Sequence, residues 1–251
     1  SFNSTLPFLF LPLIATSLID DFYDISIKYR FASQIFTSSI LVINYLSRFD
    51  QQLFIYNAAL FLLFLFFSVS VINFINFLDG IDGLITGSFL IFLIFLSLNY
   101  SFDFGLLSLI GGLATVILFN WEPAKIFMGD VGSTFLGAVY LSLVFNQRSL
   151  INSFSIVLIF MPLFIDAITT LIRRIKNKHN IFSAHKLHLY QRLHQAGMSH
   201  SNVSLIYILG IGFLSISFAF GNFAHLIIAS ICVILVGIYL DRFIAVKFNK
   251  Y

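Results

Sequence analysis

Charge is scarce in this chain. Asp, Glu, Lys and Arg make up only 10% of its 251 residues, while 59% of the residues are hydrophobic. A soluble domain carries about 25% charged residues, so this composition excludes an ordinary soluble globular protein. Cysteine is nearly absent as well, because Cys232 is the only one and lies inside an apolar run. This excludes both a disulfide framework and a metal site built on cysteine ligands.

Long apolar runs take the place of charge. A helix needs about 20 apolar residues to cross a bilayer, and nine runs are candidates, although several are short. They are roughly residues 5–19, 31–47, 53–75, 84–100, 104–119, 133–146, 154–172, 203–219 and 223–240. The sequence therefore predicts an all-α fold, a polytopic transmembrane bundle of about nine helices, with residues 1–251 as one integral membrane domain. Pro162 is expected to kink its helix.

The polar gaps between these runs form two sets that alternate along the chain. One set comprises residues 20–30, 76–83, 120–132, 173–202 and 241–251. It holds twelve of the fourteen Lys and Arg, all except Arg48 and Arg148, and eight of the eleven acidic residues. Because cytoplasmic loops carry the excess of Lys and Arg, this set is predicted to be cytoplasmic, with Ser1 external and Tyr251 cytoplasmic. The chemistry is therefore expected on the cytoplasmic face.

Asp20, Asp21 and Asp24 close the first apolar run. On a helix, Asp24 lies one turn from both of the others, so the three form an acidic corner. Such a corner suits Mg²⁺, which favours oxygen ligands and often bridges a carboxylate to a phosphate. The alternative is a solvated helix end paired with Lys28 and Arg30, and the residues leave both interpretations open.

A second acidic segment, Asn76-Phe-Leu-Asp79-Gly80-Ile-Asp82-Gly83, follows the third apolar run directly. Asp79 and Asp82 share a helical face, and carboxylates at a membrane boundary are costly unless a cation is near. The glycines leave the backbone open to a ligand, and Asn76 adds a neutral donor and acceptor. The pattern favours a divalent metal, a phosphate-bearing substrate or both over a polar loop with glycine turns.

A third acidic segment is Phe127-Met-Gly-Asp130-Val-Gly-Ser133-Thr134. Asp130 precedes the start of another apolar helix, and such an N-terminus suits phosphate. Phe127 could stack on a base, and Asn120 could reach a base edge. The alternative is an ordinary helix cap by Ser133 or Thr134. Together with the other two segments, the pattern favours a site for a phosphorylated ligand.

Residues 173–202 form the longest polar stretch and are expected to be a cytoplasmic loop. His185 and His188 are three residues apart, and Arg192 lies one turn further. One face of the loop could therefore bind a diphosphate and place an imidazole beside it.

Three other polar residues are harder to interpret. Asp166 lies within an apolar run, so it is a functional candidate by default, or it pairs with Arg173 or Arg174. His194 and His200 are interpreted as surface residues.

The order of these segments resembles that of the polyprenyl-phosphate N-acetylhexosamine-1-phosphate transferases, glycosyltransferase family 4. The resemblance covers nearly the whole chain and rests on Asp20-Asp21, the Asn76 to Leu84 segment, Phe127-Met-Gly-Asp130-Val-Gly-Ser and the histidines of residues 173–202. This stretch of residues 173–202 is called the late loop below. It implies an enzyme that transfers a sugar-1-phosphate from a UDP-N-acetylhexosamine to undecaprenyl or another polyprenyl phosphate, releasing UMP. It also implies Mg²⁺, or Mn²⁺, as cofactor and the bacterial inner (cytoplasmic) membrane as location. Membrane lipid is a further expected partner, a homodimer is a candidate assembly, and no nucleic acid is expected.

The family's roles then transfer to matching positions. Asp130 resembles the principal metal ligand beside the diphosphate. Asp20 and Asp21 match the polyprenyl-phosphate end, where they would hold the metal or the acceptor, or take its proton. Asp79 completes the acidic cluster.

The nucleotide-binding roles fall on the other motif residues. Phe127 resembles the residue that stacks on uracil, with Asn120 and Asp82 near the uridine. His188 and Arg192 would contact the diphosphate or the sugar. Asn76 and His185 are further candidates for binding the nucleotide sugar.

Two departures from the family pattern bear on function. Relatives usually have two helices before the one that ends in the Asp pair, and fewer are expected here, so the chain is interpreted as N-terminally incomplete. Many relatives carry His-x-His-His where this chain reads His188-Leu-Tyr-Gln191. This sequence looks more like that of the branch that starts O-antigen chains.

The phospho-MurNAc-pentapeptide transferase of peptidoglycan synthesis is the alternative enzyme. A non-catalytic homologue and a transporter are the rival classes, and a transporter would place carboxylates near mid-membrane.

Overall fold

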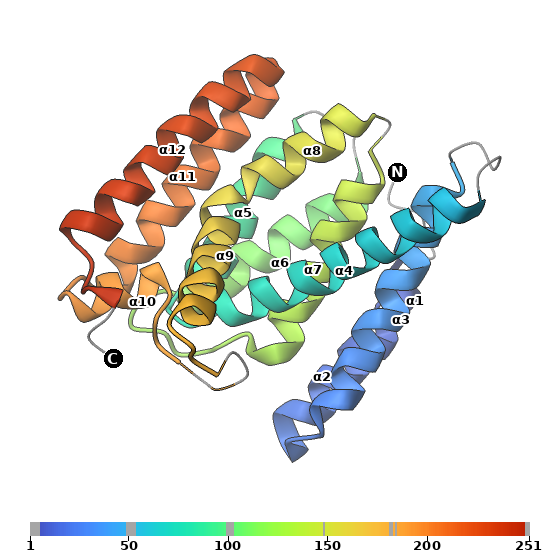
Figure 1. Ribbon diagram of the computed structural model, residues 1–251, viewed down its shortest axis with the longest axis horizontal. Helices are drawn as coiled ribbons and strands as arrows, with labels where there is room; N and C mark the ends of the chain where they lie inside the picture. The colour runs from blue at the N-terminus through green and yellow to red at the C-terminus, as the bar shows by residue number, and fades with distance from the viewer. Residues whose placement is uncertain are drawn as a thin grey trace. The chain divides into compact units, whose positions relative to one another are not determined.

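The computed structural model describes residues 6–48, 54–98, 103–147, 149–180, 183 and 185–248. Arg148 and the two chain ends, which enter the predicted membrane sidedness, lie outside these residues. Every regular element of the described chain is an α-helix, as predicted (Figure 1). The helices are α1 (Leu6–Leu9), α2 (Leu11–Tyr23), α3 (Ile27–Leu46), α4 (Phe54–Leu78), α5 (Leu84–Ser97), α6 (Phe104–Asn120), α7 (Gly129–Phe145), α8 (Leu150–Ile159), α9 (Met161–Lys176), α10 (Leu189–Gln195), α11 (His200–Phe220) and α12 (Phe223–Phe243).

The chain forms two compact units, and the single integral membrane domain expected from the sequence stays a prediction. Unit 1 comprises residues 1–76 and 128–156, and unit 2 comprises residues 77–127 and 157–251. The division falls near the end of α4 and within α8, so each unit is built from two separate stretches of chain.

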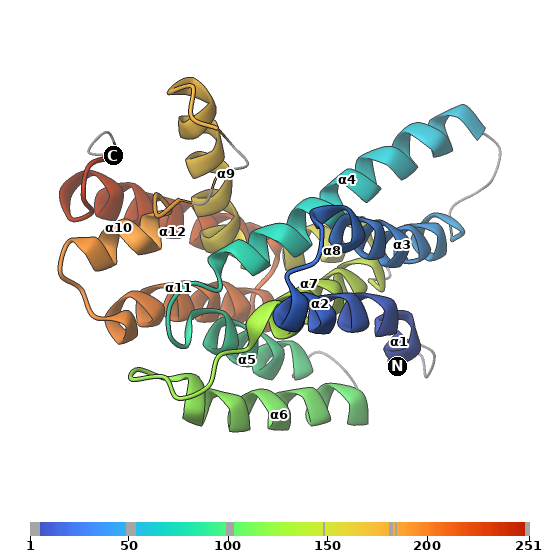
Figure 2. The same ribbon diagram turned by 90° about the horizontal axis from the view of Figure 1, so that it is seen from below.

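Unit 1 is built on α2, α3 and α7, which pack against one another (Figure 2). The end of α2 meets the start of α7, since the hydroxyl oxygens of Ser17 and Thr134 lie 3.0 Å apart. At the other end of α7, Arg48 just beyond α3 donates from Nη1 to the carbonyl oxygen of Phe145 at 3.1 Å. Helix α2 is therefore antiparallel to α7 and α3 is parallel to it. As a result, the end of α2, the start of α3 and the start of α7 meet at one end of this unit.

In unit 2, α5 contacts both α6 and α11, and α11 also contacts α9 and α12 (Figures 1 and 2). An aromatic cluster anchors α5. The ring centroid of Phe160 lies 4.8 Å from that of Phe89 and 5.0 Å from that of Phe92, with the rings edge to face. This is the arrangement that aromatic pairs prefer, and all three side chains are fully buried. The cluster fixes the junction between α8 and α9 against α5.

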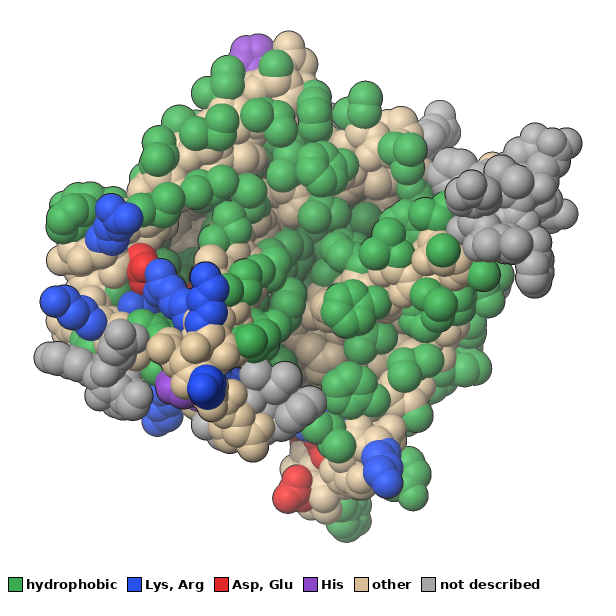
Figure 3. Space-filling view, viewed as in Figure 1, with side chains coloured by type: hydrophobic (Ala, Val, Ile, Leu, Met, Phe, Trp, Pro, Cys, Tyr) green, Lys and Arg blue, Asp and Glu red, His purple; other side chains and the backbone are tan. Residues whose placement is uncertain are grey.

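Three of the described helices, α4, α11 and α12, are long and apolar enough to cross a membrane. In α4 the candidate span begins at Ala58. Helices α8 and α9 make a fourth span if this pair, bent by 72°, is counted as one, and α5, α6 and α7 are shorter apolar helices. Figure 3 shows hydrophobic side chains over much of the visible surface, as expected for a protein in contact with lipid. The chain is a polytopic helical membrane protein.

Three predicted segments differ from the observed helices. The first apolar run forms two helices. Helix α1 ends before Phe10, and α2 begins after it with Pro12 in its first turn. The seventh run forms α8 and α9, and the break at Phe160 lies two residues before Pro162. Proline is tolerated in the first turn of a helix but not in its interior. The chain therefore starts a new helix just before Pro162, and the predicted kink is observed as the bend between α8 and α9. Helix α10 is an additional short element within the loop of residues 173–202.

Candidate functional site

A salt-bridged acidic cluster lies where three helix ends meet in unit 1. Asp20 is in the last turn of α2, Arg30 in the first turn of α3, and Asp130 in the first turn of α7. The Arg30 guanidinium contacts both carboxylates: Nη1 lies 2.9 Å from Oδ2 of Asp20, and Nη2 bonds to Oδ2 of Asp130. Asp20 also accepts a hydrogen bond from the N–H of Ile25 at 3.0 Å. One arginine thus joins two of the acidic segments.

Asp21 approaches the same end of α7. Its Oδ1 accepts a hydrogen bond at 3.2 Å from the N–H of Asp130, one of the groups that a helix N-terminus leaves without an internal partner. Gly129 makes room for this contact, because its φ is +62° and a Cβ there would lie 2.6 Å from Oδ2 of Asp21. Asn76 belongs to the same unit and donates from Nδ2 to Oγ of Ser133 at 3.3 Å.

The donor set of this cluster suits Mg²⁺, because carboxylate oxygens are the ion's preferred protein ligands. Nevertheless, no three His, Cys, Asp or Glu side chains of the described residues are arranged to hold a metal ion. Arg30 supplies the positive charge between Asp20 and Asp130 instead. A bound ion would take over part of that charge compensation. The assignment of Asp20, Asp21 and Asp130 as metal ligands therefore stays a prediction.

In unit 2, Asp82 is held at three points. Its Oδ2 accepts a hydrogen bond from the N–H of Ala124 at 3.0 Å, and its Oδ1 lies 3.1 Å from Nδ1 of His200. Its carbonyl oxygen accepts a hydrogen bond from the hydroxyl of Ser204 at 2.7 Å. The Asp82 segment is therefore tied both to the loop after α6 and to the first turn of α11.

Asn120 is buried and fixes the shape of two motif segments. Its Oδ1 accepts hydrogen bonds from the N–H of Gly83 at 3.2 Å and from the hydroxyl of Thr86 at 2.8 Å. Its Nδ2 donates to the carbonyl oxygen of Ile126 at 2.9 Å. These bonds use the amide inside the protein, so Asn120 orders the loops that carry Asp82 and Phe127. The Phe127 side chain itself is exposed, at 71%, as expected for a ring that stacks on a base.

Helix α10 supports the Asp79 segment from within unit 2. The hydroxyl of Tyr190 donates to the carbonyl oxygen of Phe77 at 3.2 Å. Burial, together with the charges of Asp166 and Asp79, raises the pKa of Tyr190, so the hydroxyl stays protonated and remains a donor.

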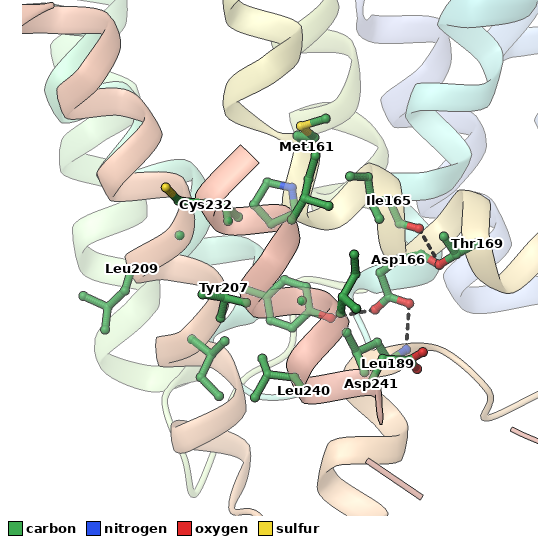
Figure 4. A pocket seen from close by; sticks show the side chains of 18 of the residues that line it. Met161, Ile165, Asp166, Thr169, Leu189, Tyr207, Leu209, Cys232, Leu240 and Asp241 are labelled. Carbon is green, nitrogen blue, oxygen red and sulfur yellow. Dashed lines mark hydrogen bonds between the residues drawn. The ribbon is translucent and has the colours of Figure 1, made fainter. Parts of the chain in front are cut away.

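Asp166 of α9 holds the N-terminus of α10 (Figure 4). Its Oδ1 accepts from the N–H of Leu189 at 2.7 Å, and its Oδ2 accepts from the N–H of Tyr190 at 3.2 Å and from the Tyr207 hydroxyl at 2.8 Å. Nδ1 of His188 lies 3.4 Å from Oδ1 of the same carboxylate. Only 2% of Asp166 is exposed. This residue therefore orders the loop that carries His188.

Arg192 is enclosed by protein, with 2% of the residue exposed. Its Nε donates to the carbonyl oxygen of Leu187 at 3.2 Å, its Nη1 donates to that of Val246 at 2.9 Å, and its Nη2 contacts Asp241. Arg173 donates to the same Asp241 carboxylate at 2.9 Å. The guanidinium of Arg192 thus joins the late loop to α12, and the predicted contact of Arg192 with the diphosphate or the sugar stays a prediction. The pairing of Arg173 with Asp241 differs from the predicted pairing with the carboxylate of α9.

An apolar cavity of about 470 Å³ lies among α9, α11 and α12. Figure 4 shows Leu209 and Cys232 on one side of it and Asp166 on another, with the Tyr207 ring between. Asp241 also lines the cavity. Two carboxylates that order the late loop therefore border a space suited to apolar groups.

His185 lies just before α10, and its ring centroid is 5.0 Å from that of His188. Burial, reinforced by nearby His188 and Arg174, lowers the pKa of His185 to about 4. Its Nδ1 accepts a hydrogen bond from the N–H of Leu187 at 3.4 Å, as a neutral imidazole can. At neutral pH, His185 therefore suits a hydrogen-bonding role rather than a cationic contact with phosphate.

This pKa gives an expected dependence of stability on pH. The folded-state value of about 4 lies below the ordinary value of 6.5, so the unfolded chain binds more protons between these values. The contribution of neutral His185 is complete above pH 6.5 and is lost as the pH falls toward 4. Thermal unfolding of His185→Asn in detergent should therefore be less sensitive to acid in this window than that of the wild type. Equal sensitivity of the two proteins would contradict the assignment.

The predicted site residues are distributed over both units. Unit 1 holds Asp20, Asp21, Asn76 and Asp130, and unit 2 holds Asp79, Asp82, Asn120, Phe127, His185, His188 and Arg192. Sequence reasoning missed the part played by Arg30 and His200. Arg30 enters the sequence interpretation only as a counter-ion at a solvated helix end. No local pattern marks His200, because its partner Asp82 lies far away in the sequence.

A family match and three relatives relate this chain to known proteins. The family described as "Glycosyl transferase family 4" matches residues 5–147. The "Probable undecaprenyl-phosphate N-acetylglucosaminyl 1-phosphate transferase" of Bacillus subtilis (strain 168) is 43% identical over 101 residues, which are 38% of this chain and 28% of that protein. The "Decaprenyl-phosphate N-acetylglucosaminephosphotransferase" of Mycobacterium leprae (strain TN) and that of Mycobacterium tuberculosis (strain ATCC 25618 / H37Rv) are each 32% identical over 112 residues, with the same coverage.

These alignments span little more than a quarter, 28%, of the length of each relative. The family match is broader, because it covers more than half of the chain and contains all three acidic segments. On this match, the chain belongs to glycosyl transferase family 4.

Proposed function

We propose that this protein transfers an N-acetylhexosamine-1-phosphate from a UDP-sugar to a polyprenyl phosphate. An oxygen of the acceptor phosphate forms a bond to the sugar-bound phosphorus. The bond from that phosphorus to the bridging oxygen breaks, and UMP leaves with that oxygen. The names of the relatives, which are polyprenyl-phosphate N-acetylglucosamine phosphate transferases, support this reaction class.

The observation that carries the proposal is the cluster of Asp20, Arg30 and Asp130 in unit 1. Two anionic phosphates must meet in this reaction, so the site needs positive charge to offset their repulsion. Arg30 supplies a guanidinium, which can bind phosphate oxygens in the bidentate manner in which it binds carboxylates. The N-terminus of α7, beside Asp130, adds backbone N–H groups that favour an anion.

We propose Mg²⁺, or Mn²⁺, as the cofactor, and Asp130, Asp20 and Asp21 would be its protein ligands. When bound, the ion would neutralise phosphate charge and make the phosphorus more electrophilic. A carboxylate oxygen of Asp20 or Asp21 would take the proton of the acceptor phosphate. Arg30 would exchange part of its contact with these carboxylates for contact with phosphate.

The residues of unit 2 would bind the nucleotide sugar. The exposed ring of Phe127 would stack on uracil, and Asp82 would accept a hydrogen bond from the uridine. Asn120 would keep both segments in place through its internal hydrogen bonds. His188, oriented by Asp166, would act as a donor to the diphosphate or the sugar, and Asp79 would be a further catalytic carboxylate.

Within this reaction class, we propose undecaprenyl phosphate in the bacterial cytoplasmic membrane as acceptor, with the site on the cytoplasmic face. The product would begin an O-antigen or another envelope polysaccharide. The His188-Leu-Tyr-Gln191 sequence favours this over the transfer of phospho-MurNAc-pentapeptide. A non-catalytic homologue is disfavoured, because Asp79, Asp82 and Asp130 are all present.

The donor sugar is the testable part of this specificity. The full chain in detergent would be given undecaprenyl phosphate, Mg²⁺ and one donor at a time: UDP-GlcNAc, UDP-GalNAc, a 6-deoxy UDP-N-acetylhexosamine or UDP-MurNAc-pentapeptide. Mass spectrometry of the lipid fraction would identify the product. We expect an undecaprenyl diphosphate sugar from one of the first three donors. Product from the pentapeptide donor alone would refute the O-antigen assignment.

A further inference from the structure

The first two turns of α11 contact two segments of the candidate nucleotide site within unit 2. His200 faces Asp82, with 3.1 Å between Nδ1 and Oδ1. The N–H of Ser201 donates to Oε2 of Glu122 at 2.6 Å, and the Ser204 hydroxyl donates to the carbonyl oxygen of Asp82 at 2.7 Å. These contacts come from a stretch outside the family match, which ends at residue 147, and reach residues inside it. The start of α11 is therefore built against the acidic motif.

The Asp82 carboxylate is fixed through both of its oxygens. Ala124 donates its N–H to Oδ2 at 3.0 Å, and His200 is the partner of Oδ1. The side chain of Asp82 is 11% exposed and that of His200 is 27% exposed. The pair thus lies at the boundary between the protein interior and solvent, where a ligand can reach it while the carboxylate keeps its orientation.

Titratable groups from three parts of the chain lie near the imidazole of His200. Asp82 follows α4, Glu122 follows α6, and His194 of α10 places its ring centroid 4.4 Å from that of His200. Hydrogen bonding to Ser201 lowers the pKa of Glu122, so this carboxylate stays ionised beside the N-terminus of α11. Two carboxylates therefore lie beside His200, and Nδ1 of its ring is 3.1 Å from Oδ1 of Asp82.

We propose that His200 is a positioning residue of the nucleotide-sugar site. Its Nδ1–H holds Oδ1 of Asp82, so the carboxylate keeps one orientation toward the uridine of a UDP-sugar. This inference rests on the proposed function, in which Asp82 contacts the uridine. If His200 were a simple surface residue, as the sequence alone suggests, its removal would leave nucleotide binding unchanged.

Two substitutions at one position test the donor directly. Asn places an amide N–H near the position of Nδ1, whereas Ala offers no donor. We expect His200→Ala to raise the KM for the UDP-sugar and the Kd for UDP about tenfold, with kcat changed less than about threefold. His200→Asn should restore both constants. The matched control is His194→Asn, because His194 contacts His200 but pairs its own Nδ1 with the carbonyl oxygen of Met198 at 2.9 Å.

UDP binding would be measured by calorimetry on the full chain in detergent, so that the result does not depend on turnover. Unchanged KM and Kd in His200→Ala would overturn the inference. Equal weakening in His200→Asn would do the same, because it would show a packing defect instead of a lost donor. If His200→Ala does not fold, His200→Phe keeps the ring against His194 and removes the donor.

A double mutant separates this inference from the proposed function. In an Asp82→Asn background, His200→Ala should cause no further loss of UDP binding, because the two residues act as one unit. An additional tenfold loss would show that His200 acts independently of Asp82 and would refute the inference. Wild-type protein that binds no UDP at all would contradict the proposed function itself.

Discussion

Asp130→Asn is expected to reduce metal-dependent turnover by about a thousandfold or more, while the protein still inserts into the membrane. Asn keeps the shape of the side chain, and the backbone N–H of residue 130 still donates its hydrogen bond to Asp21. The substitution removes the negative charge that Arg30 contacts and that a divalent ion would need. Turnover would be measured as UMP release at saturating Mg²⁺ and acceptor lipid, and insertion as recovery from the membrane fraction.

Asp103→Asn is the matched control for this loss of one carboxylate. Asp103 caps α6, with Oδ1 accepting from the N–H groups of Gly105 and Leu106 at 3.0 and 3.2 Å. Asn caps helices about as well as Asp, so this variant should fold and turn over normally. Retained turnover in Asp130→Asn would refute the assignment of Asp130 to the metal.

Asp166→Ala is expected to destabilise the protein by about 3–5 kcal/mol, because several buried donors lose their acceptor at once. Asp166 accepts hydrogen bonds from the N–H groups of Leu189 and Tyr190 and from the Tyr207 hydroxyl, all in a buried setting. Its removal leaves these donors without an acceptor and releases His188 from its partner. Helix α10 should then lose order, which hydrogen exchange in the late loop would detect together with a lowered Tm in detergent.

Tyr207→Phe provides the comparison, because it removes only one of the donors to Asp166 and leaves the carboxylate bonded to α10. Its cost should be about 1 kcal/mol, with α10 still protected from exchange. If Asp166→Ala were no more destabilising than Tyr207→Phe, Asp166 would not be the residue that orders the late loop.

The acidic cluster of unit 1 shows what the sequence could supply. Apolar runs and the bias of Lys and Arg place the Asp20 and Asp130 segments on one predicted side of the membrane, and the structure brings these two residues to the same arginine. The arginine itself was not predicted as part of the site. A basic residue one turn into a helix is usual near a membrane surface, so position alone does not distinguish Arg30 from an anchor.

The late loop shows which contacts the sequence could not supply. His188 and Arg192 share a predicted helical face, but the structure buries Arg192 against Asp241 and Val246 and presents His188 to Asp166. These partners come from α9, α12 and the segment after α12. Hydrophobic periodicity reports which side of a helix faces apolar surroundings, but not which distant polar residue meets it.

The contrast between Phe127 and Asn120 has the same cause. Both were predicted to contact a base, and the exposure of Phe127 agrees with that role. Asn120 is instead engaged with Gly83, Thr86 and Ile126. An amide serves equally well in a ligand contact and in an internal bond, and only the three-dimensional arrangement distinguishes the two.

The most direct measurement of the proposed transferase activity is UMP release by the full chain in detergent. UDP-N-acetylhexosamine would be supplied with and without undecaprenyl phosphate, and with and without Mg²⁺. A sugar-1-phosphate transferase releases UMP only when both the lipid and the metal are present, and this is the expected result. UMP release that is independent of the lipid, or no release with any N-acetylhexosamine donor, would contradict the proposed function.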